Sequence, residues 1–265
     1  MSATLTNAIE AQAPPECKTP QDEIVVSYLN LRGAIGFVGL GLPFALLLGE
    51  AIIQTYFPTA LGPQRSMSEY YYTAMRGVFV GSLCAIGAFL GSYRGEHHPW
   101  DRVLALVACV SAIGVALFPC GNSEWAFEAM WEKVLTVLHF SFAGILFFIL
   151  ATFCVWLFPK YAPGGPQTKA ALPNTSRKPE RNFVYYTCGI VIYSMIAAIG
   201  IWKLLTSSNF YPQWNAGLVF PWYPIYWFEF VAVATFGFSW IVKGHFILPD
   251  KDENSKKENS SSMRD

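Results

Sequence analysis

The chain has 265 residues, of which 53% are hydrophobic and 14% are charged, and its formal net charge is zero. That composition is unusual for a soluble domain and typical of a protein embedded in lipid. A balanced charge without a basic, aromatic-rich face gives no support for nucleic-acid binding, so no nucleic-acid partner is expected.

Six apolar stretches follow one another along the chain, and a helix of about 20 such residues crosses a bilayer. The third stretch is the shortest, so it spans only if it is nearly upright or if the bilayer is locally thin. A buried soluble helix could explain any single stretch. Six in series, with the charges in the gaps, predict an all-α, polytopic bundle of six transmembrane helices over residues 31–243. The expected spans are residues 31–57, 75–93, 103–119, 134–158, 183–205 and 218–242.

Lysines and arginines are distributed unevenly among the gaps. Fourteen of the 18 lie around the start of the first stretch, between the second and third, between the fourth and fifth, or after the sixth. Because positively charged loops stay in the cytoplasm, this pattern predicts an even number of spans with both termini cytoplasmic. Residues 1–30 then form a cytoplasmic N-terminal tail, residues 159–182 a cytoplasmic linker, and residues 244–265 a disordered cytoplasmic C-terminal tail.

Polar residues lead into the second stretch in the sequence "SMSEYYYTAMRG", residues 66–77. Ser66 followed by Glu69 fits a capping box at the start of a helix. A helix that begins there places Glu69, Tyr72 and Arg76 on one face at the outer membrane interface. The tyrosines also fit an ordinary aromatic belt, with one of the three turned inward.

Further ionisable residues fall in the outer half of the spans, namely Glu50, His139 and Glu229. Glu229 lies deepest, within the hydrocarbon, where a charge costs about 2.5–3.5 kcal/mol, so this side chain either finds a partner inside the bundle or stays protonated. Arg76 is the natural partner, with His139 and Glu50 as alternatives. The inner half carries almost no charge, so we expect a polar pocket open to the outside rather than a continuous pore. A salt bridge that only fixes helix register explains the same residues.

Several common catalytic motifs are missing from the sequence. It has no glycine-rich phosphate loop, no paired-cysteine zinc motif and no G-x-S-x-G elbow. The cysteines fit a role as small packing residues, because most of them lie inside predicted spans. We therefore expect no metal ion and no cofactor.

Three groups of residues carry a resemblance to a known family. They are "SMSEYYYTAMRGVFVG", "ALFPCG" followed by "VLHFSFAGILFF", and "WFEFVAVATFGFSWIVKG". They resemble the recurring motifs of uncharacterised bacterial six-helix integral membrane proteins, a domain of unknown function, over residues 32–244. The resemblance implies a multi-pass protein of the plasma membrane, here the bacterial inner membrane, but no particular activity. It also marks eight positions, Ser68, Tyr72, Arg76, Pro119, His139, Glu229, Ser239 and Lys243.

The chain is also distantly similar to the CREST membrane hydrolases, in which three histidines hold a zinc ion. Ser68 and His139 match that pattern only loosely. The other histidines, His97, His98 and His245, are predicted at the cytoplasmic side, about 30 Å from His139. A three-histidine zinc site is therefore rejected.

These observations leave three functional hypotheses. The preferred one is binding or transport of a small molecule or lipid in the outward pocket, without catalysis. An intramembrane hydrolase acting on lipid is the second, with His139 or Glu229 as general base and Arg76 stabilising an anion. The third is a structural membrane subunit whose polar cluster only locks packing. Membrane lipids are expected partners, and the ligand and any oligomeric partner stay open. The ligand-binding candidates are Glu50, Ser68, Glu69, Tyr72, Arg76, His139 and Glu229.

Overall fold

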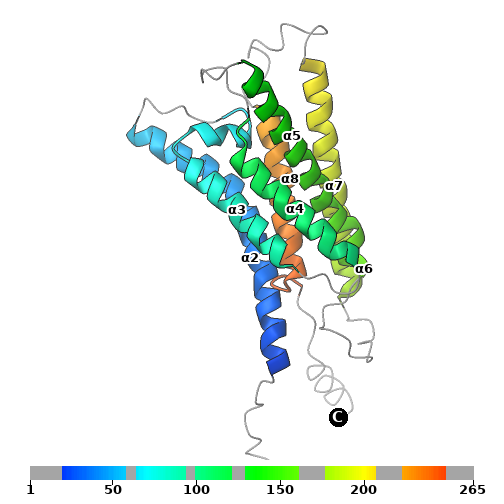
Figure 1. Cartoon of the computed structure of the whole chain (residues 1–265). Coiled ribbons are helices and arrows are strands. Elements are labelled where there is room, and N and C mark those ends of the chain that lie inside the picture. The colour runs from blue at the N-terminus through cyan, green and yellow to red at the C-terminus, as the bar shows by residue number, and fades with distance from the viewer. Residues whose placement is uncertain are drawn as a thin grey trace, which may run out of the picture.

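The structure is a computed structural model that describes residues 20–57, 64–93, 99–120, 129–160, 177–206 and 223–248. Within those ranges every regular element is helical and no strand is present. Figure 1 shows the long helices gathered into one bundle. They are α2 (Pro20–Tyr56), α3 (Arg76–Ser92), α4 (Pro99–Leu117), α5 (Ala129–Thr152), α7 (Lys178–Thr206) and α8 (Pro224–Lys243).

Three shorter elements complete the described chain. The 3₁₀ helix η1 (Met67–Tyr72) lies between α2 and α3 at the top of Figure 1, and we call that end of the bundle the η1 end. The π-helix η2 (Phe153–Leu157) and α6 (Phe158–Lys160) follow α5 without a break. Elements α5, η2 and α6 therefore form one long helical segment.

The helices are those of a multi-pass membrane protein. Five are long and apolar enough to cross a bilayer: Leu29–Tyr56, Trp100–Leu117, Met130–Lys160, Lys178–Thr206 and Pro224–Lys243. The remaining long helix, α3, is also apolar but has 17 residues, so it is about 26 Å long at 1.5 Å per residue. An all-helical membrane bundle is thus confirmed.

The predicted boundaries are less accurate than the predicted spans. The first helix begins at Pro20, inside the expected N-terminal tail, and α5 and α7 also begin before their apolar stretches. Hydropathy marks only the lipid-facing part of a helix, whereas helical hydrogen bonding continues into the polar flanks. The last helix begins at Pro224, and residues 218–222 of the predicted sixth span lie outside the described residues.

The chain after α8 is ordered for a few residues and folds back on α2. The rings of Phe246 and Phe37 meet edge to face, with centroids 5.4 Å apart. The carbonyl of Leu248 accepts a hydrogen bond from the buried Arg181 guanidinium at 3.1 Å. The expected disorder of residues 244–265 is therefore wrong for 244–248, and the rest lies outside the described residues.

Helices α2 and α8 approach one another backbone to backbone. A Cβ atom placed on Gly237 of α8 would lie 2.2 Å from the backbone nitrogen of Leu40 and 2.6 Å from the carbonyl oxygen of Gly36. Only a residue without a side chain allows this separation, which is how membrane helices commonly pack. This contact fixes α8, and with it Glu229, relative to the rest of the bundle.

Candidate functional site

The chain between α2 and α3 crosses the η1 end of the bundle, and we call residues 64–75 the η1 segment. Thr73 is the C-cap of η1: its backbone N–H makes the last i→i+3 hydrogen bond, to the Tyr70 carbonyl at 3.2 Å, and its hydroxyl donates to the same carbonyl at 3.1 Å. The backbone of Thr73 is extended, so the chain turns before α3 begins at Arg76. The prediction that Glu69 and Arg76 share one helical face is therefore wrong.

The predicted capping box is also not formed. Ser66 is the N-cap residue of η1, but its side chain makes no capping hydrogen bond. Instead Oε2 of Glu69 accepts the backbone N–H of Arg65 at 2.9 Å. The reciprocal pattern of a capping box suits the first turn of an α-helix, and η1 has the tighter turn of a 3₁₀ helix.

Pro119 ends α4 and leaves two carbonyl groups for other partners. Proline disfavours helical geometry in the residue before it and has no N–H to donate, so α4 ends at Leu117. The carbonyl of Phe118 accepts a hydrogen bond from Nδ1 of His139 at 2.6 Å. The carbonyl of Cys120 accepts one from the Tyr72 hydroxyl. The end of α4 is thereby joined to α5 and to η1.

His139 connects this helix end to the η1 segment. Its Nε2 lies 2.8 Å from Oγ of Ser68, and the two side chains are 1% and 8% exposed. A carbonyl oxygen can only accept, so Nδ1 must carry the proton that it shares with Phe118. In neutral imidazole the other nitrogen is then an acceptor, and Ser68 donates its hydroxyl proton to Nε2. The surroundings thus select one tautomer of His139.

Glu229 attaches the same segment to α8. Its Oε2 accepts the backbone N–H of Met67 at 2.6 Å, next to Ser68 in the chain. The start of α8 adds a second bond, because the backbone N–H of Tyr226 donates to the Arg65 carbonyl at 3.1 Å. Two hydrogen bonds to α8 and one to α5 therefore fix the position of Ser68 in the bundle.

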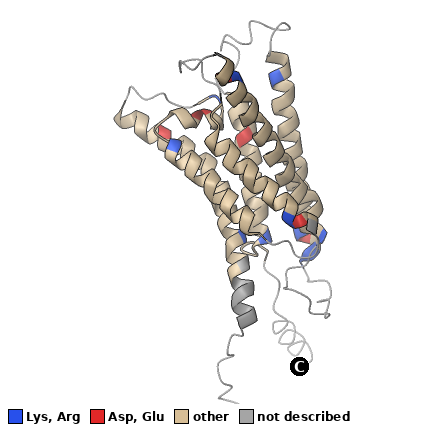
Figure 2. Ribbon diagram, in the orientation of Figure 1, with Lys and Arg blue, Asp and Glu red and all other residues tan. Residues whose placement is uncertain are grey.

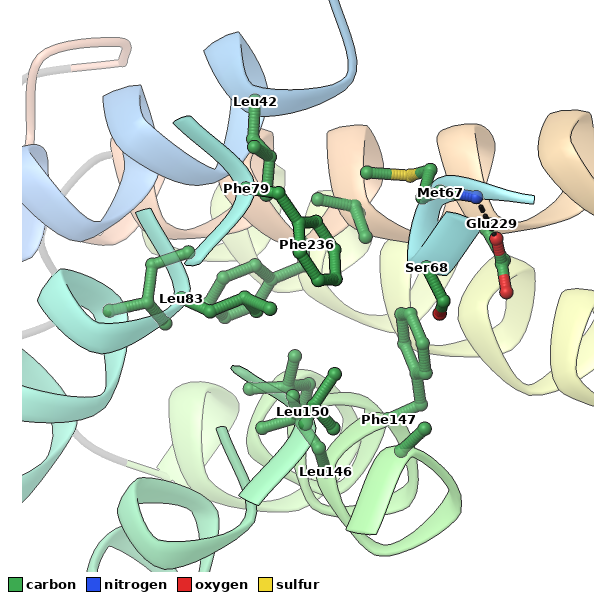
Figure 3. A pocket seen from close by; sticks show the side chains of 14 residues that line it. Leu42, Met67, Ser68, Phe79, Leu83, Leu146, Phe147, Leu150, Glu229 and Phe236 are labelled. Atoms are coloured by element: carbon green, nitrogen blue, oxygen red, sulfur yellow. Dashed lines mark hydrogen bonds between the residues drawn. The ribbon is translucent and has the colours of Figure 1, made fainter. Parts of the chain in front are cut away.

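A cavity of about 60 Å³ lies below the η1 segment, enclosed by η1, α2, α3, α4, α5 and α8. Figure 3 shows Ser68 and Glu229 at one side of it and Leu83 at the other, with Phe236 between. The cavity has a polar end and an otherwise apolar lining. Its apolar residues are Leu42, Met67, Phe79, Leu83, Ile86, Val115, Ala143, Leu146, Phe147, Leu150, Val233 and Phe236.

Three of the predicted ligand-binding residues therefore converge, namely Ser68, His139 and Glu229. Ser68 and Glu229 line the cavity, and His139 lies directly behind Ser68. Tyr72 lies beside this group, where its hydroxyl holds the Cys120 carbonyl. Glu69 is elsewhere on the η1 segment, bonded to Arg65.

Arg76 does not reach the cavity, and its predicted pairing with Glu229 is wrong. Its Nη2 donates to the Tyr71 hydroxyl at 2.6 Å, and its guanidinium carbon lies 4.1 Å from the centre of the Tyr71 ring. The arginine is exposed, and no ion pair joins these two described side chains. The sequence indicated that both residues lie in the outer half of the bundle, but not on which helix faces they lie.

Glu50 is buried apart from the cavity, on α2. It is 1% exposed, and its Oε2 has no hydrogen-bond partner among the described residues. The pKa of the nearby Tyr70 hydroxyl is raised, mainly by burial and in addition by the charge of Glu50. Tyr70 is in turn packed against Tyr226, with ring centroids 6.0 Å apart. Glu50 thus belongs to a separate polar group behind η1.

The polar groups near the end of α4 stay neutral. Burial is the main reason that the pKa of the Cys120 thiol is raised to about 12, and the charges of Glu69 and Glu229 add to it while Lys203 opposes them. Burial likewise raises the pKa of Tyr72 to about 12. Tyr72 therefore keeps the proton that it donates to the Cys120 carbonyl throughout the physiological pH range.

Sequence reasoning missed the groups that position these side chains. The Phe118 carbonyl and the Met67 N–H belong to the backbone, and Lys203 was not among the candidates although its charge acts on the same region. Pro119 was a usable signal, because a proline after a helix frees the preceding carbonyls. In the part of the chain that the structure describes, no three His, Cys, Asp or Glu side chains form a group that could hold a metal ion.

Comparison of the chain with protein families, with curated proteins and with solved structures finds no match. Membership of the six-helix family named above therefore stays a prediction.

Proposed function

We propose that the protein crosses the plasma membrane six times, with both termini in the cytoplasm, and binds the apolar chain of a small amphiphile or lipid in the cavity below η1. The observation that carries the proposal is the composition of the cavity lining, which is polar at Ser68 and Glu229 and apolar elsewhere. A ligand with a hydrogen-bonding head and a hydrocarbon chain matches that lining.

The distribution of charge supports the orientation. Figure 2 shows most lysines and arginines at the end of the bundle opposite η1. Among them are Lys160 at the end of α6, Lys178 at the start of α7 and Lys243 at the end of α8. By the positive-inside rule that end faces the cytoplasm, and the η1 end with the cavity faces outward. In this proposal α3 crosses the membrane in addition to the five longer helices. A small tilt of its neighbours or local thinning of the bilayer accommodates its short length.

The size of the cavity restricts the ligand. A volume of about 60 Å³ is well below the roughly 300–1,000 Å³ of drug-sized ligand sites. A rigid, bulky molecule does not fit in this conformation, whereas part of an unbranched hydrocarbon chain does. Relative to water, each CH₂ group of the ligand that is buried in the cavity would contribute about 0.8 kcal/mol to the binding free energy.

The polar end restricts the head group. Glu229 offers a carboxyl group, and its Oε2 already accepts one hydrogen bond from the Met67 N–H. Ser68 donates its proton to His139, so its oxygen is left as an acceptor. The Ser68 oxygen therefore favours a head that donates a hydrogen bond, such as an alcohol or a glyceride, over a fatty-acid anion.

Binding of tritiated decanol to the full-length protein in lipid nanodiscs tests the proposal. The variant Ala143→Phe adds a ring to the cavity wall and should reduce binding at least tenfold. Its matched control is Ala197→Phe, which adds the same ring at an exposed position of α7 and should bind as the wild type. Equal binding by the two variants would contradict the cavity as the site.

A cytoplasmic C-terminus is tested separately. A green fluorescent protein fused after Asp265 should fold and fluoresce, while alkaline phosphatase fused at the same place should be inactive. The opposite pair of results would reverse the orientation and place the cavity toward the cytoplasm.

A further inference from the structure

Ser68 and His139 have the arrangement of a nucleophile and its general base. Oγ of Ser68 lies 2.8 Å from Nε2 of His139, within the distance over which a base takes a proton in one step. The Phe118 carbonyl, 2.6 Å from Nδ1, holds the ring in the tautomer whose free lone pair faces the serine. A base that is itself oriented by a third group is the recurring logic of serine hydrolases.

The position of Ser68 adds the second requirement, which is access to a substrate. Ser68 lines the cavity, and the side chains beyond it, including Leu83, Leu146 and Phe236, are apolar. Figure 3 shows the serine at the polar side of this space, next to Phe147. A carbonyl group attached to a hydrocarbon chain in the cavity would lie beside the serine oxygen.

From this geometry we propose that Ser68 is an acyl-accepting nucleophile and that the protein hydrolyses carboxylic esters with a slim acyl chain. The inference rests on the proposed binding site and names the reaction and the substrate class of that site. His139 is the general base and acid. Phe118, through its carbonyl, is a positioning residue.

The reaction proceeds in two balanced steps. In the first, Oγ of Ser68 bonds to the ester carbonyl carbon while its proton moves to Nε2 of His139, and the alcohol leaves with that proton as its C–O bond breaks. In the second, a water molecule attacks the acyl-serine, His139 takes a proton from the water, and Ser68 leaves with it. One ester and one water give one acid and one alcohol, with no change of oxidation state.

An alkyl fluorophosphonate tests the nucleophile directly, because the serine oxygen bonds to its phosphorus as fluoride leaves. The full-length protein in nanodiscs should be labelled, and mass spectrometry should place the adduct on Ser68. Ser68→Ala should remove the label. Ser141→Ala is the matched control, since Ser141 is exposed on the same helix as His139 and bonds to the Val137 carbonyl; it should be labelled like the wild type.

The base is tested with His139→Gln, which keeps hydrogen-bonding groups near Ser68 but cannot take a proton at neutral pH. General-base catalysis typically contributes about 10²–10⁴-fold, so labelling should slow by at least about 100-fold. Hydrolysis of 1-monodecanoylglycerol to decanoate and glycerol should be lost in Ser68→Ala and in His139→Gln. Equal labelling rates for His139→Gln and the wild type would overturn the role of His139.

Decanol binding separates failure of this inference from failure of the binding site. Decanol binding is therefore measured on the wild type, and Ser68→Ala should keep the helical circular-dichroism spectrum and the cooperative melting of the wild type, which shows that its loss of label does not come from unfolding. If the wild type binds decanol but Ser68 is never labelled, the nucleophile is refuted and the binding function stands. If neither binding nor labelling occurs, the binding site and the hydrolase both fall.

Discussion

Removal of the Glu229 carboxylate should release the η1 segment from α8. Oε2 of Glu229 accepts the Met67 N–H at 2.6 Å, and Met67 is 4% exposed. In Glu229→Ala that N–H has no acceptor, which costs about 1–3 kcal/mol for a buried donor. Glu229→Gln keeps an oxygen in the same place, so it should retain most of the bond.

Hydrogen exchange of the protein in nanodiscs measures this release. Since about 1.4 kcal/mol corresponds to a factor of ten, amide exchange in residues 64–75 should accelerate by about 5- to 150-fold in Glu229→Ala. Glu229→Gln should stay within a few-fold of the wild type. Glu180→Ala, which makes the same substitution at an exposed position at the other end of the bundle, is the control. Unchanged exchange in Glu229→Ala would refute the attachment of η1 to α8 through this side chain.

Three further predictions concern packing, reactivity and the arginine. Gly237→Ala should destabilise the protein by about 1–3 kcal/mol, because its Cβ would lie 2.2 Å from the Leu40 nitrogen. Its melting temperature in detergent should therefore fall. The control Gly144→Ala, with open space around its Cβ, should keep the melting temperature of the wild type. In a variant whose only cysteine is Cys120, alkylation by N-ethylmaleimide should rise about tenfold per pH unit up to about pH 11 without a plateau near 9, because the thiolate is the reactive form and its pKa of about 12 keeps it scarce. Arg76→Ala should change decanol binding by less than about twofold, because the guanidinium contacts Tyr71 at the surface; a tenfold loss would contradict the site.

The membrane architecture was the part of the structure that sequence could predict well. Hydrophobic length and the absence of charge are local properties, and they suffice to locate a helix in a bilayer. They do not determine where a helix ends, because the polar flanks of α2 and α7 continue the helical hydrogen bonds. They also do not show the break at Thr73, where the backbone becomes extended.

The candidate site was predictable in depth but not in direction. Ser68, His139 and Glu229 were all expected at the outer side of the bundle, with Glu229 deepest, and in the structure they surround one end of the cavity. Arg76 was also expected at the outer side but faces elsewhere, because the turn at Thr73 separates η1 from α3. Depth follows from counting residues along a helix, whereas the direction of a side chain depends on packing between helices.

The most direct test of the account is to locate the bound chain. Decanol with a photoreactive diazirine on a chain carbon near its hydroxyl group would be bound to the protein in nanodiscs, irradiated, and its adducts mapped by mass spectrometry. We predict adducts on apolar residues inside the cavity, such as Leu83, Ile86 and Leu150, that disappear in Ala143→Phe. Adducts confined to exposed residues such as Phe148 and Ile190, unchanged in that variant, would contradict the proposed site.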